Sequence, residues 1–348
     1  MENTKINIRQ LTELELKDAI QALGEKPFRA KQITEWLWKK GARTFGTMSD
    51  LPLKLRESLE ENYTFAALKI DTVQQSLLDN TCKTRYITHD GHYIEGVLIP
   101  APHLDLLTAC VSSQIGCSLT CKFCATGKMN RVRNLTSEEI FDQYIMMNEQ
   151  ALNEFGKPLT NVVYMGMGEP MLNYNNVMES IERITKFGEF GFSPKRITIS
   201  TAGIAKMITK MADDNSKCNL ALSLHAANDT KRSEIMPINE SNTLVVLQEA
   251  LQHYYNTTGN IVTLEYILLR DFNDSNVDAN ELIYFARKVP CKVNIIEYNS
   301  IGDGQYQATS EDKLNAFVRA ITMAGITINV RRSKGKDIDA ACGQLANK

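Results

Sequence analysis

Hydrophobic and polar positions follow a regular strand–helix order from about residue 106 onward. Short apolar runs of strand type alternate with longer segments in which apolar residues recur at helical spacing. Six strand–helix units follow one another, and a last strand-like run closes the series. The predicted strands are residues 108–114, 161–166, 196–201, 219–225, 261–269, 292–299 and 326–332. The predicted helices are residues 136–152, 175–188, 203–214, 243–255, 276–289 and 310–325.

This order predicts an α/β fold in which parallel strands are joined by helical crossovers. Six units are too few for a complete barrel of eight, so we expect an open, partial (β/α)6 barrel. A doubly wound sheet is the alternative. In either fold the functional site is expected at the carboxyl ends of the strands, because the loops that build such sites meet there.

Residues 1–62 have a different pattern and are predicted to form a small helical domain. Helical spacing occurs at residues 11–24, 27–41 and 51–61, and Pro27 and Gly41 are typical of the first turn and the end of the middle helix. Between residues 26 and 43, six cations stand against one glutamate. Such a basic module suits a nucleic-acid backbone, although a solvated helix face has the same composition. Trp36 and Trp38 are expected to pack in a small core.

Residues 63–105 are predicted to form a β-hairpin element that links this domain to the barrel, which spans residues 106–348. The run at residues 83–100 is rich in strand-forming residues and is interrupted at Asp90 and Gly91. An Asp-Gly pair between two such runs is a strong hairpin signal, because these residues tolerate the positive φ angles of a tight turn.

Composition narrows the class of protein. The 348 residues are 43% hydrophobic and 23% charged, which excludes collagen-like and disordered chains. The sequence contains neither a run of 18 apolar residues nor the pattern of a signal peptide, so we expect a cytoplasmic protein without a membrane segment. The net charge of -2 excludes binding of a polyanion through total charge alone, while local basic patches remain possible.

Eight cysteines introduce the candidate chemistry, since structural disulfides are not expected in a cytoplasmic chain. Cys117, Cys121 and Cys124 form a C-x3-C-x2-C loop directly after the first barrel strand. Three thiolates without an obvious fourth ligand disfavour structural zinc, which requires a closed tetrahedron. They suit an iron–sulfur cluster with one iron open to a ligand. Three cysteines match no motif and are expected to be buried as small hydrophobic residues of the core. They are Cys82, Cys218 and Cys291.

The cysteine loop resembles the cluster-binding motif of the radical S-adenosylmethionine (SAM) superfamily, in which the open iron chelates SAM. Residues 165–170, MGMGEP, end the second strand and resemble the GGEP motif of that superfamily. The resemblance implies a 4Fe-4S cluster on the three cysteines and a SAM whose amino group is held at Gly168 and Glu169. The further SAM contacts that it implies, at strand ends, are Ser200, Ser223, Leu224, His225 and Asn299.

Over essentially its whole length the chain resembles the dual-specificity 23S rRNA/tRNA adenine carbon-2 methyltransferases. The segments with this resemblance are residues 111–127, 164–170, 197–203, 221–239 and 337–345. The resemblance implies that one SAM methylates Cys342, and that a second SAM gives a 5′-deoxyadenosyl radical, which abstracts hydrogen from the S-methyl group. The methylene radical then adds to adenine, Cys110 releases the product by forming a disulfide with Cys342, and Glu95 accepts a proton.

A radical route fits this substrate. Carbon 2 of adenine lies between two ring nitrogens and is electrophilic, so it cannot attack the SAM methyl group directly. The target base must also leave its stack to reach the site. The implied partners are 23S rRNA, tRNA near the anticodon and a flavodoxin-type electron donor, and we expect a monomer. The basic segments that are expected to contact RNA phosphates are residues 26–43, 128–133 and 331–336.

Three other interpretations remain open from the sequence. The first is the antibiotic-resistance relative that methylates carbon 8 of the same rRNA adenosine; Pro170 and the basic N-terminal module favour carbon 2. The second is a radical SAM dehydrogenase or peptide-modifying enzyme, which would not need Cys110 and Cys342. The third is a non-catalytic RNA-binding module stabilised by zinc.

Overall fold

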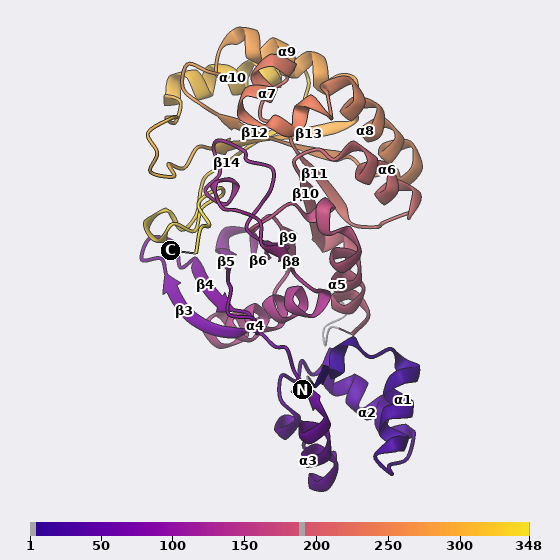
Figure 1. Ribbon diagram of the computed structural model, residues 1–348. Coiled ribbons are helices and arrows are strands. Elements are labelled where there is room, and N and C mark those ends of the chain that lie inside the picture. The colour runs from indigo at the N-terminus through magenta and orange to yellow at the C-terminus, as the bar shows by residue number, and fades with distance from the viewer. Residues whose placement is uncertain (1–4, 188–191, 348) are drawn as a thin grey trace.

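A curved sheet of ten strands forms the centre of the protein (Figure 1). The computed structural model describes residues 5–187 and 192–347, so the last residue of the predicted helix 175–188 lies outside the described residues. Seven strands of the sheet are parallel and neighbour one another in chain order, from the middle of the sheet to one edge. They are β6 (Leu106–Cys110), β9 (Asn161–Tyr164), β10 (Ile197–Thr201), β11 (Asn219–Ser223), β12 (Val262–Leu268), β13 (Cys291–Glu297) and β14 (Ile328–Arg331).

The order of these strands distinguishes the two predicted folds. A doubly wound sheet reverses its strand order at a switch point. In the described residues the order of the parallel strands has no such reversal, and the sheet curves around a centre (Figure 1). The predicted partial barrel is therefore confirmed.

Helices on the outer side of the curved sheet connect the parallel strands (Figure 1). Each predicted helix is present, and a short helix that the sequence pattern did not predict, α7 (Asp229–Ile235), follows β11. Within the described residues, no helix is long and apolar enough to cross a membrane. The predicted crossovers are α4 (Ser137–Phe155), α5 (Tyr174–Phe187), α6 (Ala205–Asp213), α8 (Leu244–Thr258), α9 (Asn276–Ala286) and α10 (Glu311–Met323).

The ends of α4 show why these segments are helical. At its start the Thr136 side chain accepts the Glu139 amide N–H, and the Glu139 carboxylate accepts the Thr136 amide N–H in return. This capping box satisfies two backbone donors that the helix cannot pair internally. At its end Gly156 adopts a φ of 68°, which terminates the helix without the strain that a Cβ would cause.

Three antiparallel strands extend the same sheet beyond β6. The hairpin predicted around Asp90 and Gly91 is confirmed as the pair β4–β5. Because β5 also pairs with β6, the hairpin continues the barrel sheet rather than forming a separate layer. The strands are β3 (Lys69–Gln75), β4 (Cys82–Ile87) and β5 (Tyr93–Ala101).

The N-terminal helices form a module with its own core. It contains α1 (Glu13–Ala22), α2 (Phe28–Thr34) and α3 (Leu53–Asn62), and a short parallel pair, β1 (Ile6–Asn7) and β2 (Tyr63–Thr64), closes it. The middle helix continues from α2 as a wider π-helical turn and ends before Gly41, at a φ of 65°. Trp36 and Trp38 pack against the core of this module, as predicted.

A buried ion pair joins this module to the barrel. The Arg9 guanidinium donates to both oxygens of Asp142 in α4, at 2.6 and 3.0 Å, and the two side chains are only 1% and 2% exposed. The amide N–H of Leu68 donates to the same carboxylate at 2.9 Å. Trp38 meets Phe141 edge-on, with ring centroids 5.6 Å apart. The Asp142 carboxylate on α4 therefore binds both the N-terminal module, through Arg9, and Leu68, the residue that precedes β3.

The segment that follows β14, residues 333–347, returns across the barrel opening to the antiparallel strands. The amide N–H of Gly335 donates to Asp79 at 3.0 Å, and the Ser76 hydroxyl donates to Asp337 at 2.7 Å. Further along, the amide N–H of Ala346 donates to Glu95 in β5 at 2.9 Å. The C-terminal segment thus links the two edges of the sheet.

Asp142→Ala is expected to lower the free energy of unfolding by about 3–5 kcal/mol, because Arg9 would remain charged and buried without a partner. Glu182→Ala, which removes one side of the exposed Glu182–Lys186 pair, is the control and should cost less than about 1 kcal/mol. Urea unfolding followed by circular dichroism measures both. Equal decreases in the free energy of unfolding for the two variants would contradict the importance of the Arg9–Asp142 ion pair.

Candidate active site

A cavity opens at the carboxyl ends of the parallel strands, where the sequence places the candidate chemistry. Its volume is about 950 Å³, including the part open to solvent. The loop after β6, the turn after β9 and the ends of β10, β11 and β12 line it, and Cys342 and Gly343 complete the wall from the C-terminal segment. Its size is within the range of cofactor and substrate sites.

All three cysteines of the C-x3-C-x2-C loop line this cavity. Three thiols with an open cavity beside them suit a cluster that leaves one iron free for another ligand.

The protonation of these thiols also bears on the fit. Burial raises the pKa of Cys117 to about 11, and it raises the pKa values of Cys121 and Cys124 as well. Thiols in such surroundings become thiolates, the form that binds metal, when a nearby cation compensates their charge. Without a metal these three thiols are therefore protonated, and binding of a cluster must displace their protons.

Two glycines bring the turn after β9 against the segment that leads to the cysteines. A Cβ at Gly166 would lie 2.6 Å from the Ser112 Oγ atom, and a Cβ at Gly168 would lie 2.4 Å from the Cβ of Gln114. Gly168 also has a φ of +92°, a conformation that side chains disfavour. The MGMGEP sequence and the cysteine loop therefore meet because glycine allows this close approach.

Glu169 ends this turn and is 4% exposed. Its Oε1 atom accepts the amide N–H of Met171 at 3.0 Å, and its Oε2 atom accepts the amide N–H of Ala202 at 2.7 Å. Burial raises the pKa of Glu169 to about 7. The carboxyl group thus ties the turn after β9 to the loop after β10, and it lines the cavity at the same time.

The other residues for which SAM contacts are predicted divide into two groups. Ser200, Ser223 and His225 line the same cavity as Gly168 and Glu169. Leu224 is fully buried, and its amide N–H donates to the Glu265 carbonyl at 3.0 Å. The side-chain amide of Asn299 donates to the carbonyl of Cys342 at 3.3 Å, so this residue supports the C-terminal segment.

His225 is held in one orientation at the end of β11. Its Nδ1 atom accepts the amide N–H of Ile267 at 3.2 Å, and its ring packs edge-on against Phe123 at 4.7 Å. Burial lowers the pKa of His225 to about 3. The imidazole is therefore neutral and presents an uncharged polar face to the cavity.

A second cavity adjoins the first and is lined by both Cys110 and Cys342. The two cavities share Cys124 and Arg331 in their walls. Cys110, at the end of β6, is 7% exposed, whereas Cys342 is exposed. Burial raises the pKa of Cys110 to about 12, and negative charge on Cys342 adds to that increase.

Sequence reasoning did not assign Arg331 and Glu265 to the site. The Nη1 atom of Arg331 lies 3.4 Å from the Oε2 atom of Glu265, and both residues line the main cavity. Although Cys342 as a residue is exposed, the cavity walls around its sulfur desolvate it and raise its pKa, and the positive charge of Arg331 opposes this increase. The available signal was a lone acid within the otherwise apolar run 261–269, because a buried carboxylate requires a cation or donors nearby.

Glu95 does not line either of these two cavities in the described structure. It is 0% exposed, and its Oε2 atom accepts the amide N–H groups of Ala346 and Asn347 at 2.9 and 3.0 Å. The Nζ atom of Lys83 lies 3.5 Å from its Oε1 atom. The structure therefore places this predicted proton acceptor against the C-terminal segment.

The predicted basic segments are partly neutralised by acidic partners. Lys128 pairs with Asp303, and Arg332 pairs with Glu311 at 2.7 Å. In these segments, the cations that have no acidic oxygen within 4.0 Å among the described residues are Lys26, Lys31, Lys39, Arg131 and Lys334.

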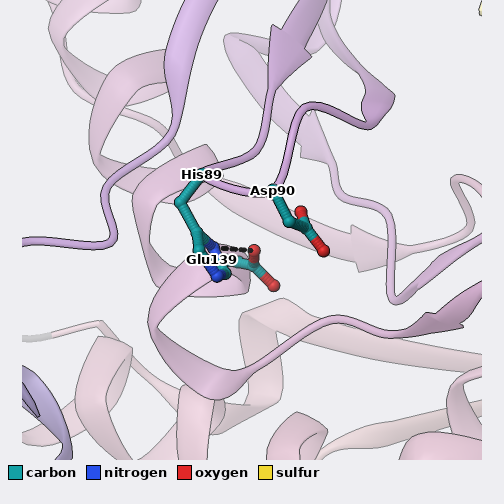
Figure 2. A group of neighbouring side chains, drawn as sticks. All are labelled: His89, Asp90 and Glu139. Atoms are coloured by element: carbon teal, nitrogen blue, oxygen red, sulfur yellow. Dashed lines mark ion pairs between the residues drawn. The ribbon is translucent and has the colours of Figure 1, made fainter. Parts of the chain in front are cut away.

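His89, Asp90 and Glu139 lie together where the β4–β5 turn meets the start of α4 (Figure 2). Their ligand atoms lie within 4.8 Å of one another, a spacing that a metal ion would accept. However, Arg133 donates to Asp90 at 2.7 Å and to Glu139 at 2.8 Å. Its guanidinium lowers the pKa of Asp90 and already neutralises the carboxylates. The group is an ion-pair network, and Arg133 serves the fold rather than a free basic surface.

Comparisons with known proteins define the class. Residues 6–64 match the ribosomal RNA large subunit methyltransferase N-terminal domain, and residues 111–280 match the radical SAM superfamily. The solved structure of a radical SAM methyltransferase from Sphaerobacter thermophilus superimposes with a TM-score of 0.92 at 38% identity, covering 99% of this chain and 100% of that one.

Relatives along the whole chain give the family. A protein of Cytophaga hutchinsonii described as "probable dual-specificity RNA methyltransferase RlmN" is 54% identical over 98% of this chain and 93% of its own length. A protein of Flavobacterium johnsoniae with the same description is 47% identical over 100% of this chain and 99% of its own. The chain therefore belongs to the RlmN family of radical SAM methyltransferases, a family that implies a 4Fe-4S cluster and SAM.

Anaerobic reconstitution with iron and sulfide is expected to give a brown protein with about four irons per chain. Cys121→Ala should lose the visible absorption and most of the iron, because two thiolates cannot hold the cluster. Cys291→Ala, which changes a cysteine outside the cavity, is the control. Metal analysis that finds only zinc, or an unchanged iron content in Cys121→Ala, would contradict the assignment.

The buried neutral His225 is expected to make stability depend on pH. An unfolded histidine takes up a proton near pH 6.5, whereas the folded pKa is about 3. The contribution of His225 is therefore complete above pH 6.5 and is lost as the pH falls toward 3. Below pH 6.5 the unfolding free energy of the metal-free protein should fall by up to about 1.4 kcal/mol per pH unit more than that of His225→Asn. Urea unfolding at pH 7, 6 and 5 measures this difference, and equal slopes would contradict it.

Proposed function

We propose that the protein methylates carbon 2 of a specific adenosine in 23S rRNA, and also in tRNA near the anticodon, through an S-methylcysteine on Cys342. The observation that supports this most directly is that Cys342 and Cys110 line one cavity, which adjoins the cysteine loop. A radical SAM enzyme with another class of substrate would need neither thiol at this place.

The residues of the chain have separate roles in this proposal. Cys117, Cys121 and Cys124 hold the cluster, and the turn at Gly168 and Glu169 holds the amino group of SAM. When bound, the cluster supplies the electron that cleaves SAM reductively. The neutral polar side chains at the strand ends contact the rest of SAM, and they are Ser200, Ser223 and His225.

Cys342 and Cys110 act in sequence. The Cys342 sulfur first takes a methyl group from one SAM, and a second SAM serves the radical step, so that each turnover uses two. After the carbon joins the base, the Cys110 sulfur attacks the Cys342 sulfur, the carbon–sulfur bond breaks as the disulfide forms, and the released methylene carbon takes a proton to become the methyl group. Glu95 accepts the proton that carbon 2 of the base loses, and the one electron left over from the radical adduct would return to the cluster. A reductant must then restore both thiols, which a cytoplasmic location would provide.

The RNA must deliver an unstacked base to the cavity. We infer that phosphates are contacted by cations without an acidic partner, namely Lys26, Lys31 and Lys39 in the N-terminal module and Lys334, which lines the second cavity. Such contacts position an RNA without reading its sequence. A flavodoxin-type protein is proposed as the electron donor, and the protein is proposed to act as a monomer.

Mass spectrometry of nucleosides from 23S rRNA and tRNA, treated with reconstituted enzyme, SAM and reductant, is expected to find 2-methyladenosine. Cys342→Ala should abolish the product, and Cys110→Ala should leave RNA covalently attached to the protein, because the link to Cys342 cannot be broken. Cys218→Ala, at a buried cysteine that lines neither of the two cavities, is the control and should retain activity.

Two outcomes would overturn the proposal. An 8-methyladenosine product would identify the carbon-8 activity instead. Full turnover by Cys342→Ala would favour a radical SAM enzyme that acts on a substrate other than RNA.

A further inference from the structure

The segment that contains Cys342 has little regular structure of its own to hold it. Residues 339–347 lie outside the described helices and strands. On one side they contact the cysteine loop, where the amide N–H of Ala125 donates to the Gly343 carbonyl at 2.7 Å and the Thr126 hydroxyl donates to the Leu345 carbonyl at 2.6 Å. On the other side they face β4 and β5. The position of Cys342 therefore depends on the side chains of β4 and β5 that contact this segment.

Two charged side chains contact this segment, Lys83 from β4 and Glu95 from β5. In the antiparallel register Lys83 is opposite Val97, and Arg85 is opposite Glu95, so Lys83 and Glu95 are diagonal neighbours on one face of the sheet. Their side chains are 4% and 0% exposed, and Nζ lies 3.5 Å from Oε1. They form an ion pair that is fully withdrawn from water.

This pair contacts the segment on both sides of Cys342. Before it, the Lys83 Nζ atom donates to the Asp339 carbonyl at 3.5 Å. After it, the Oε2 atom of Glu95 accepts the amide N–H groups of Ala346 and Asn347. The Oε1 atom of Glu95 has no hydrogen bond among the described residues, and the Lys83 ammonium faces it.

Stability alone does not explain such a pair. A buried ion pair is often no more stabilising than well-packed apolar side chains of the same volume. Apolar side chains, however, cannot pair with a partly buried backbone carbonyl and two partly buried amide N–H groups, and a group left unpaired away from water is costly. One lysine and one glutamate together supply the donor and the acceptors that an irregular segment needs at both ends.

We propose that Lys83 and Glu95 are positioning residues that clamp residues 339–347 at both ends, and so hold the Cys342 sulfur toward the cavity that contains Cys110. Lys83 lines neither of the two cavities in the described structure, and Glu95 acts here before any proton transfer. The need to position Cys342 rests on the proposed function, whereas the clamp itself is a property of the folded chain.

Hydrogen exchange tests the clamp in the intact, full-length protein. Lys83→Met keeps most of the apolar stem and removes the charge, and it is expected to speed exchange of peptides within residues 339–347 at least about tenfold. Peptides of α8 and of the N-terminal module should be unaffected. Lys83→Arg, which retains a donor, should restore most of the protection. Lys69→Met, at an exposed lysine of β3, is the matched control.

The same variants are then tested for methylation of Cys342 by SAM in the reconstituted enzyme, measured by peptide mass spectrometry. Lys83→Met should lower the rate constant about tenfold and leave the KM for SAM unchanged, because the cofactor site is intact. Glu95→Gln is the second variant, and it tests the clamp if Lys83→Met does not fold. It retains one acceptor oxygen, and methylation of Cys342 precedes the step in which Glu95 would accept a proton.

The outcomes separate the two proposals. Unchanged exchange of residues 339–347 in both Lys83→Met and Glu95→Gln would overturn the clamp, even if wild type forms 2-methyladenosine. Faster exchange throughout the protein, without a local effect, would also overturn it. If wild type forms no S-methylcysteine while local exchange is still accelerated, the clamp stands and the proposed function fails.

Discussion

The attachment of residues 339–347 between the cysteine loop and β5 is the interaction on which the candidate site depends. The hydrogen bonds of Ala125 and Thr126 to this segment place Cys342 beside Cys124, and the Glu95 carboxylate holds the segment from the opposite side. Without these contacts the barrel would still have a cysteine loop and a cavity. It would lack the wall that joins the main cavity to the one that contains Cys110.

The cavity is nearly free of net charge until a cation enters it. Burial raises the pKa values of the cysteine thiols and of Glu169, and it lowers the pKa of His225. Arg331 faces the carboxylate of Glu265. Loading of a metal centre must therefore displace protons from the thiols, so assembly of the cluster is coupled to proton release.

The sequence predicted the features that depend on neighbouring residues in the chain. Strand and helix periodicity located the parallel strands and their crossovers, and the spacing of Cys117, Cys121 and Cys124 identified the cysteine loop. The short helix α7 was not predicted, because seven residues hold too few turns to show a period. The hairpin around Asp90 was predicted, but its pairing with β6 depends on a contact that no local pattern encodes.

Most of the remaining site could not be predicted for a related reason. The two backbone amides that Glu95 accepts lie more than 250 residues away along the chain, and Arg331 lies 66 residues from Glu265. A charged residue in a sequence does not show whether it will face water or another charge. Arg133 illustrates this, since it belongs to a basic segment and yet is used to neutralise Asp90 and Glu139.

The long separation between Glu95 and the segment that it binds also orders the events of synthesis. The cysteine loop is synthesised about two hundred residues before Cys342, and a contact across 251 residues cannot form until both of its ends exist. An incomplete chain therefore contains the metal ligands without the cysteine that is to be methylated. Enclosure of the reactive centre has to wait for synthesis of the last residues of the C-terminal segment.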